Sequence, residues 1–202
     1  MIKTKITYCW ELGAGLGHVT RIDSICNRPE FVNTEFNFVL KDINKAAYIA
    51  KATKINVYAA PHFIHSPAQY RSPNFAHIML RCGWQNTNSA YDLVLSWLQI
   101  LEKLQPEVVF IDYAPTAAIA AKLLNIPFLF LGNGFEFPPA EYPFPSILPY
   151  QKVSHKELIN WHNQLQNTLD LVCGKLSKSK SAFDLTEIFH SKRGLLIADP
   201  ML

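Results

Sequence analysis

Short apolar runs of strand length alternate with helical patterns along most of the chain. The runs lie at residues 2–10, 36–40, 55–58, 108–111, 127–131 and 195–198. This alternation is typical of parallel strands, because a parallel pair needs a crossover connection that usually carries a helix. We therefore predict an α/β fold with a parallel sheet flanked by helices.

Three segments carry helix signals. Residues 89–104 repeat apolar side chains at helical spacing and stop before a Gln-Pro pair, and residues 115–125 begin with a proline that suits a first helical turn. Ser154 and Glu157 form a capping-box pattern ahead of an apolar stripe that extends to residue 176. We expect a helix in each segment.

Two long segments, 61–86 and 132–149, break this rhythm and are predicted to be loops above the sheet, where ligands are often held. Their aromatic residues suit the wall of an apolar acceptor pocket or ordinary packing, and both interpretations stay open. Glu136 and Glu141 could hydrogen-bond acceptor hydroxyls, but we expect both to be surface carboxylates. The aromatic residues are Phe63, Tyr70, Phe75, Trp84, Phe135, Phe137, Tyr142 and Phe144.

Composition places the 202-residue chain among globular proteins, since 49% of its residues are hydrophobic and 17% are charged. It has no apolar run near the roughly 18 residues of a membrane span and no signal-peptide pattern, so a cytoplasmic location is expected. The net charge of +3 is spread thinly, and we expect no nucleic-acid partner. The four cysteines lie far apart and are expected to be reduced thiols.

The most informative segment is ELGAGLGHVTR, residues 11–21, which follows the first strand and leads into a helix. Gly13, Gly15 and Gly17 let the backbone turn tightly and approach a ligand, while the helix start offers free N–H groups to the phosphate of a bound donor or to an acceptor. A dinucleotide fingerprint would need a third glycine at position 18, which is histidine. Asp42 could still mimic the acidic ribose ligand of an NAD site, so that alternative remains open.

Two stretches together resemble a known family. Gly17-His18 ends a glycine-rich turn after the first strand, and the segment 104–139 contains IDYAP with Asp112 at a strand end. Both resemble the N-terminal domain of the UDP-sugar glycosyltransferase superfamily, which has the GT-B fold. The resemblance covers most of residues 1–139.

The resemblance implies the N-terminal half of a GT-B fold, with a Rossmann-like sheet. Residues 1–150 would form the acceptor-binding domain, and residues 151–202 would add its C-terminal helices and last strand, stopping before a donor-binding domain. The implied enzyme moves a sugar from a nucleotide-sugar donor to a small-molecule, lipid or glycan acceptor and uses no cofactor. Without the donor domain, the chain alone is expected to be inactive.

His18 and Asp112 suit this chemistry. An acceptor hydroxyl must lose a proton before it attacks the anomeric carbon, and imidazole titrates near neutral pH. A carboxylate on the other ring nitrogen would orient the imidazole and stabilise its charged form. Both residues follow predicted parallel strands at their carboxyl ends, so the fold could bring them together. Alternatively, His18 caps its own helix and Asp112 caps the helix that begins at Pro115.

Two further hypotheses remain. His62, His65, His77 and Cys82 contain metal-ligand types, but their spacing is irregular, and we predict no metal site. The chain could also be a non-catalytic or regulatory Rossmann-like module that self-associates or recruits a partner subunit.

Overall fold

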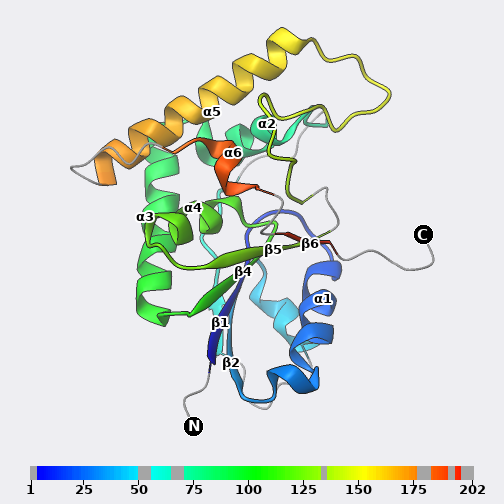
Figure 1. Ribbon diagram of the computed structural model, residues 1–202, viewed down its shortest axis with the longest axis vertical. Helices are drawn as coiled ribbons and strands as arrows, with labels where there is room; N and C mark the ends of the chain where they lie inside the picture. The colour runs from blue at the N-terminus through cyan, green and yellow to red at the C-terminus, as the bar shows by residue number, and fades with distance from the viewer. Residues whose placement is uncertain are drawn as a thin grey trace.

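A six-stranded parallel sheet lies at the centre of the computed structural model (Figure 1). The structure describes residues 4–49, 56–64, 71–132, 136–176 and 183–190 and the backbone of residues 194–196. The strand order is β3-β2-β1-β4-β5-β6, which is the doubly wound Rossmann order. The strands are β1 (Thr4–Trp10), β2 (Thr34–Leu40), β3 (Asn56–Ala59), β4 (Val108–Asp112), β5 (Phe128–Gly132) and β6 (Gly194–Leu196).

The predicted α/β class, with a Rossmann-like parallel sheet, is confirmed. Each strand begins and ends within about two residues of its expected bounds wherever the chain is described. Residues 197 and 198, which the sequence assigned to the last strand, lie outside the described part. Every strand pair is parallel, so all six strands end at one edge of the sheet.

Helices cover both faces of the sheet (Figure 1). On one face lies α1 (Gly17–Cys26), and on the other lie α3 (Thr87–Leu104) and α4 (Pro115–Leu123). Helix α5 (His155–Leu176) packs on α3. The shorter elements are η1 (Pro29–Phe31), η2 (Ile43–Tyr48), α2 (Phe75–Met79), η3 (Leu80–Trp84) and α6 (Leu185–Ile188).

Strand β1 is buried on both faces. Tyr8 and Trp10 belong to the hydrophobic cluster on the α1 side, together with Ile22, whereas Cys9 belongs to the cluster on the α3 and α4 side. Successive side chains of a strand point to opposite faces, so a strand between two helical layers is buried on both, and the buried part of β1 is largely apolar apart from Thr7. This burial fixes the direction in which the chain leaves β1 towards the glycine-rich turn.

The predicted helix ends are confirmed. The side chain of Asn86 accepts the N–H groups of the first turn of α3, and Gln105, at φ 48°, ends this helix. Ser154 and Glu157 form the expected capping box, because the N–H of Glu157 donates to Oγ of Ser154 and the N–H of Ser154 donates to Glu157. Local sequence therefore determined these boundaries.

The segment 61–86 was wrongly predicted to be a loop, since it contains α2 and η3. Asn74 caps α2 by accepting the N–H of His77. The aromatic side chains of Phe75, Trp84 and Phe144 are fully buried in the core, so they do not wall a pocket. Tyr70 and Phe135, also named in that hypothesis, lie outside the described residues.

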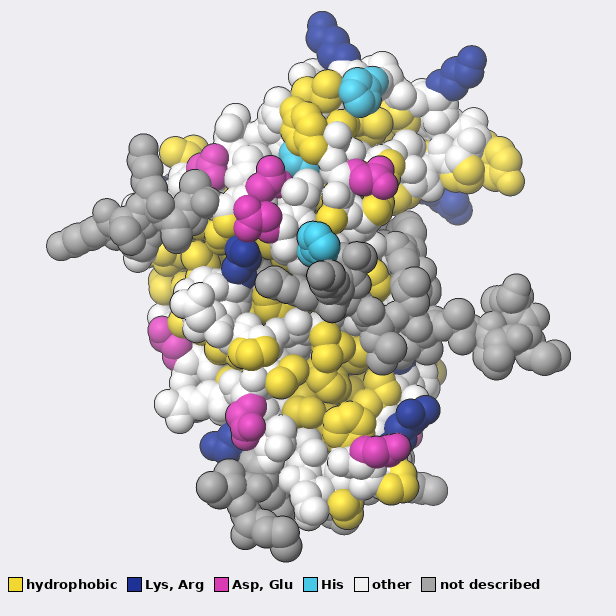
Figure 2. Space-filling view, in the orientation of Figure 1, with side chains coloured by type: hydrophobic (Ala, Val, Ile, Leu, Met, Phe, Trp, Pro, Cys, Tyr) yellow, Lys and Arg dark blue, Asp and Glu magenta, His cyan; other side chains and the backbone are white. Residues whose placement is uncertain are grey.

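The surface combines apolar and charged areas. Figure 2 shows hydrophobic side chains gathered in the middle of the viewed face, with acidic and basic side chains at the margins of the patch. The cysteines are free thiols, as expected. No described helix combines the length and hydrophobicity that crossing a membrane requires.

Candidate functional site

The site lies where β1 and β4 end side by side. Trp10, the last residue of β1, pairs with Asp112, the last residue of β4. Strand order reverses between these two strands, and in open α/β sheets such a point opens a crevice at the carboxyl ends of the strands. The chain leaves β1 through the glycine-rich turn and enters α1 at Gly17, which places His18 in the first helical turn above this crevice.

The structure brings His18 and Asp112 together. Nδ1 of His18 lies 2.7 Å from Oδ1 of Asp112. A carboxylate only accepts hydrogen bonds, so Nδ1 carries the proton in the neutral imidazole and Nε2 holds the free lone pair. The ring stacks on Trp10, with 4.8 Å between centroids. Proximity of the two side chains is thus established, while their catalytic role stays a prediction.

Asp112 is fully buried and has three partners. Besides His18, the hydroxyl of Tyr8 donates to Oδ2 at 2.6 Å, and Nη1 of Arg21 forms an ion pair with Oδ1 at 2.8 Å. Burial and the nearby Asp112 carboxylate raise the pKa of Tyr8, so its hydroxyl stays a donor. Partners of this kind offset the high cost of burying a carboxylate.

The proposed capping roles are wrong. Helix α4 has Ala114 at its N-cap, without a side-chain cap, and α1 has Leu16 there, again without one. The carboxylate of Glu11 takes over for α4, since it accepts the N–H of Thr116 at 2.9 Å and the hydroxyl of the same residue at 2.6 Å. Burial raises the pKa of Glu11 to about 7, against the lowering effect of these hydrogen bonds.

Arg21 and Glu136 are further members of the site. Nη2 of Arg21 donates to Oε1 of Glu136 at 3.1 Å, and the same oxygen lies 4.0 Å from Nδ1 of His18. Burial disfavours the charged guanidinium, but Asp112 and Glu136 outweigh it and raise the pKa of Arg21. Glu136 is 8% exposed, so the prediction that it is a surface carboxylate is wrong.

The glycine-rich turn faces the free nitrogen of His18. Gly13 has φ +76°, and a Cβ built there would lie 3.0 Å from Nε2 of His18 and 3.0 Å from the ring of Tyr113. Gly15 has φ +103° and open space around it. Gly17 also has open space around it, but its φ is not positive. A side chain at position 13 would therefore crowd both Nε2 of His18 and the ring of Tyr113, and glycine avoids these contacts.

Two lysines hold the turn from outside. The ammonium group of Lys41 donates to the carbonyl of Gly13 at 3.0 Å, and that of Lys45 donates to the carbonyl of Gly15 at 3.1 Å. These bonds satisfy carbonyl groups of the turn and place two positive charges beside it. Contact of the turn with a phosphate stays a prediction.

The side-chain contacts give little support to a bound cation or to a bound dinucleotide. His18, Asp112 and Glu136 offer three ligand-type atoms within 4.8 Å of one another, but the guanidinium of Arg21 already contacts both carboxylates and takes the place of a cation. Asp42 accepts the N–H of Asn44 and thereby caps η2.

The histidines of segment 61–86 that could have bound a metal make other contacts. Nδ1 of His62 lies 2.9 Å from the carbonyl of Ala60, and His77 packs edge-on against Trp161. His65 lies outside the described residues. Within the described part of the chain, His62, His77 and Cys82 do not come together as a possible metal site.

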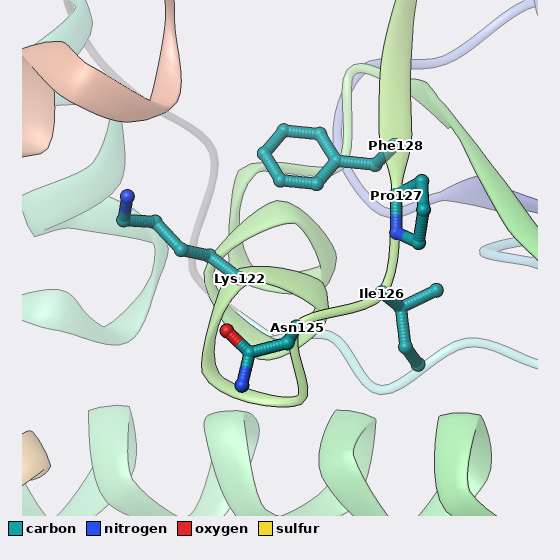
Figure 3. A pocket seen from close by; sticks show the side chains of 5 residues that line it. All are labelled: Lys122, Asn125, Ile126, Pro127 and Phe128. Atoms are coloured by element: carbon teal, nitrogen blue, oxygen red, sulfur yellow. The ribbon is translucent and has the colours of Figure 1, made fainter.

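A pocket of about 370 Å³ lies elsewhere, at the start of β5 (Figure 3). It is lined by Lys122, Asn125, Ile126, Pro127 and Phe128. The start of a parallel strand is at the opposite edge of the sheet from His18 and Asp112, so this pocket does not belong to the site. Lys122, its charged residue, pairs with Glu187 at 3.2 Å.

Sequence reasoning missed Tyr8, Glu11 and Arg21, and it favoured a surface position for Glu136. Arg21 lies three positions after His18 on one helix, and such residues share a face, so the spacing was a usable signal. Tyr8 lies two residues before the end of β1 and points to the α1 side. No local pattern indicated Glu136, which reaches the site only through the path of the chain after β5.

Comparisons with known proteins give likenesses of fold. No protein-family model and no curated protein sequence matches the chain. The chain is similar to the glycosyltransferase VinC in complex with DTDP, at 10% identity and a TM-score of 0.49, over 98% of this chain and 49% of that one. It is also similar to CalG4, the calicheamicin glycosyltransferase, at 15% identity and a TM-score of 0.47, over 90% and 43%.

A third similar structure is the UDP-GlcNAc 2-epimerase from Neisseria meningitidis bound to UDP-GlcNAc. Its identity is 12% and its TM-score 0.41, over 96% of this chain and 45% of that one. The chain spans less than half the length of each of the three. Two of these three proteins are glycosyltransferases, and the third is an epimerase.

Proposed function

We propose that the chain is the acceptor-binding half of a glycosyltransferase, with His18 as the general base and Asp112 as the residue that orients it. One observation carries the proposal, the 2.7 Å contact between Nδ1 of His18 and Asp112 at the point where the strand order reverses. The resemblance of the glycine-rich turn and the IDYAP segment to UDP-sugar transferases supports the reaction class.

The proposed step begins with an acceptor hydroxyl within hydrogen-bonding distance of Nε2 of His18, the ring nitrogen that does not contact Asp112. Nε2 takes the hydroxyl proton as the acceptor oxygen attacks the anomeric carbon of the nucleotide sugar. The bond between that carbon and the phosphate oxygen breaks, and the nucleoside diphosphate leaves with the electron pair. The imidazolium is stabilised by the Asp112 carboxylate, because opposite charges attract strongly in a buried site.

Transfer also requires a donor held in line with the acceptor. Positioning of two reactants accounts for much of the rate enhancement in such reactions. We assign the donor site mainly to a second domain, on a continuing chain or a partner subunit, and the acceptor to this one. The apolar patch in Figure 2 suits contact with such a partner or with a second copy of the chain.

The test is sugar transfer from UDP- and TDP-sugars to phenolic, lipid and glycan acceptors, by the purified chain with and without a donor domain. We expect little transfer by residues 1–202 alone and transfer once the donor domain is supplied. Robust turnover by the chain alone would contradict the half-enzyme proposal. Absence of transfer in every combination would favour a regulatory or non-catalytic module.

The base is tested in the active combination. His18→Ala should lower kcat by roughly 10²-fold or more, the effect of losing a general base. His155→Ala is the matched control, since His155 is exposed at the start of α5 and far along the chain from the dyad. Equal turnover of the two variants would remove His18 from the mechanism.

A further inference from the structure

Glu136 is buried in the site and pairs with Arg21. Its side chain is 9% exposed, and its Oε1 accepts a hydrogen bond from Arg21. A Cβ on Gly132, the last residue of β5, would collide with the carboxylate of Glu136, so glycine at this position leaves the room that the carboxylate fills. Burying a carboxylate is costly unless it is paired, which indicates that its position beside Arg21 is specific.

The charges around His18 balance only when Glu136 is counted. Oδ1 of Asp112 is shared by His18, at 2.7 Å, and Arg21, at 2.8 Å. Asp112 and Arg21 alone form a neutral pair, so a proton on His18 would leave a buried positive charge. With Glu136, the described cluster is negative when His18 is neutral and becomes neutral when His18 is protonated.

The other described groups near the imidazole are two phenols and two lysines. Lys41 and Lys45 are held on carbonyl groups of the glycine-rich turn and are the same in the wild type and in the variants compared below. Tyr113 stacks on the imidazole and Tyr8 contacts Asp112, and both are uncharged phenols, since burial raises the pKa of both. Lys45 lies on the Trp10 ring, 5.2 Å from its centroid, and is hydrogen-bonded to the glycine-rich turn. Among the described residues, the charged side chains that pair with the dyad in the contacts above are Arg21 and Glu136.

We infer that Glu136 is a positioning residue of the site, which offsets the charge of Arg21 and so allows His18 to accept a proton. This role rests on the proposed function, because it makes His18 a competent base for the acceptor hydroxyl. It also links the segment after β5 to the dyad, since Arg21 connects Glu136 with Asp112 through ion pairs of 3.1 and 2.8 Å.

The test follows the His18 ring signals by NMR during a pH titration of the 202-residue chain, with the signals assigned through His18→Gln. Glu136→Gln should move the midpoint of this titration to lower pH by about one unit, the effect of losing one nearby opposite charge. Arg21→Gln should move it to higher pH. Glu141→Gln is the matched control, an exposed carboxylate on the same segment, and should leave the midpoint in place.

A folded Glu136→Gln chain with the wild-type midpoint, or with a midpoint at higher pH, would overturn the inference. If Glu136→Gln does not fold, the Arg21→Gln chain decides, because a midpoint that stays or falls there contradicts the same charge balance. These titrations need no transfer activity. Failure of the proposed function appears as absent transfer with the midpoints shifted as stated, whereas failure of this inference appears in the midpoints themselves.

Discussion

Oδ1 of Asp112 lies 2.7 Å from Nδ1 of His18, although the two residues are 94 positions apart in the chain. The contact joins the first turn of α1 to the last residue of β4. It leaves Nε2 of the imidazole directed at Gly13 of the glycine-rich turn.

Asp112→Asn should destabilise the chain and impair transfer. An asparagine offers one oxygen acceptor, whereas Asp112 serves His18, Arg21 and Tyr8 together. Breaking a buried ion pair in this way costs roughly 3 kcal/mol, measurable by urea denaturation of the chain alone. Asp92→Asn is the control, because Asp92 is exposed on α3. Equal stability of the two variants would show that the buried network contributes little.

The three glycines of the turn should respond differently to alanine. Gly13→Ala should destabilise the chain by roughly 1–3 kcal/mol and shift the His18 ring signals, because it adds both a strained backbone and a Cβ 3.0 Å from Nε2. Gly15→Ala adds the backbone strain alone, and Gly17→Ala adds neither. Urea denaturation and the histidine NMR spectrum check the series, and a perturbation of His18 by Gly17→Ala as large as by Gly13→Ala would contradict it.

Glu11 should make stability depend on pH. Its pKa is raised from 4.5 to about 7 in the folded chain, so the folded state holds this proton more tightly than the unfolded state. The contribution is fully present below about pH 4.5 and is lost as pH rises to about 7, and it amounts to roughly 3 kcal/mol. Urea denaturation from pH 4 to 8 should show this fall in the wild type relative to Glu11→Gln. Parallel curves for the two chains would refute it.

His162 should act in the opposite direction. Its Nδ1 accepts the N–H of Phe144 at 3.2 Å, and burial lowers the pKa of His162, against the raising effect of Asp184. A lowered pKa means that this contribution is present above about pH 6.5 and is lost as pH falls through the folded-state pKa.

The wild type should therefore lose stability on acidification relative to His162→Gln, whose carbonyl can still accept a hydrogen bond. The measurement is urea denaturation between pH 5 and 8. His155→Gln provides the comparison, as an exposed histidine on the same helix. A pH dependence that His162→Gln shares with wild type would assign the effect to another group.

The sequence by itself determined the strands, most of the helices and the two residues of the dyad. Strands and helices follow from periodicity and end signals within a few residues, as at the Gln105-Pro106 pair that ends α3. His18 and Asp112 were found because each lies directly after or at the end of a strand, and parallel strands end at one edge of the sheet. Local sequence patterns therefore indicated both the bounds of the elements and the two residues of the dyad.

Only the tertiary structure decided which charges surround the dyad and which residue caps α4. Arg21 meets Glu136 across 115 positions, and Glu11 meets Thr116 across 105. From the sequence, Asp112 was a candidate cap of α4, but in the structure Glu11 accepts the N–H of Thr116. From the sequence, Glu136 was expected at the surface, but in the structure it is buried. The difference arises because burial removes water as a competing partner, so each polar group must bond to whichever group the packing of distant segments places beside it.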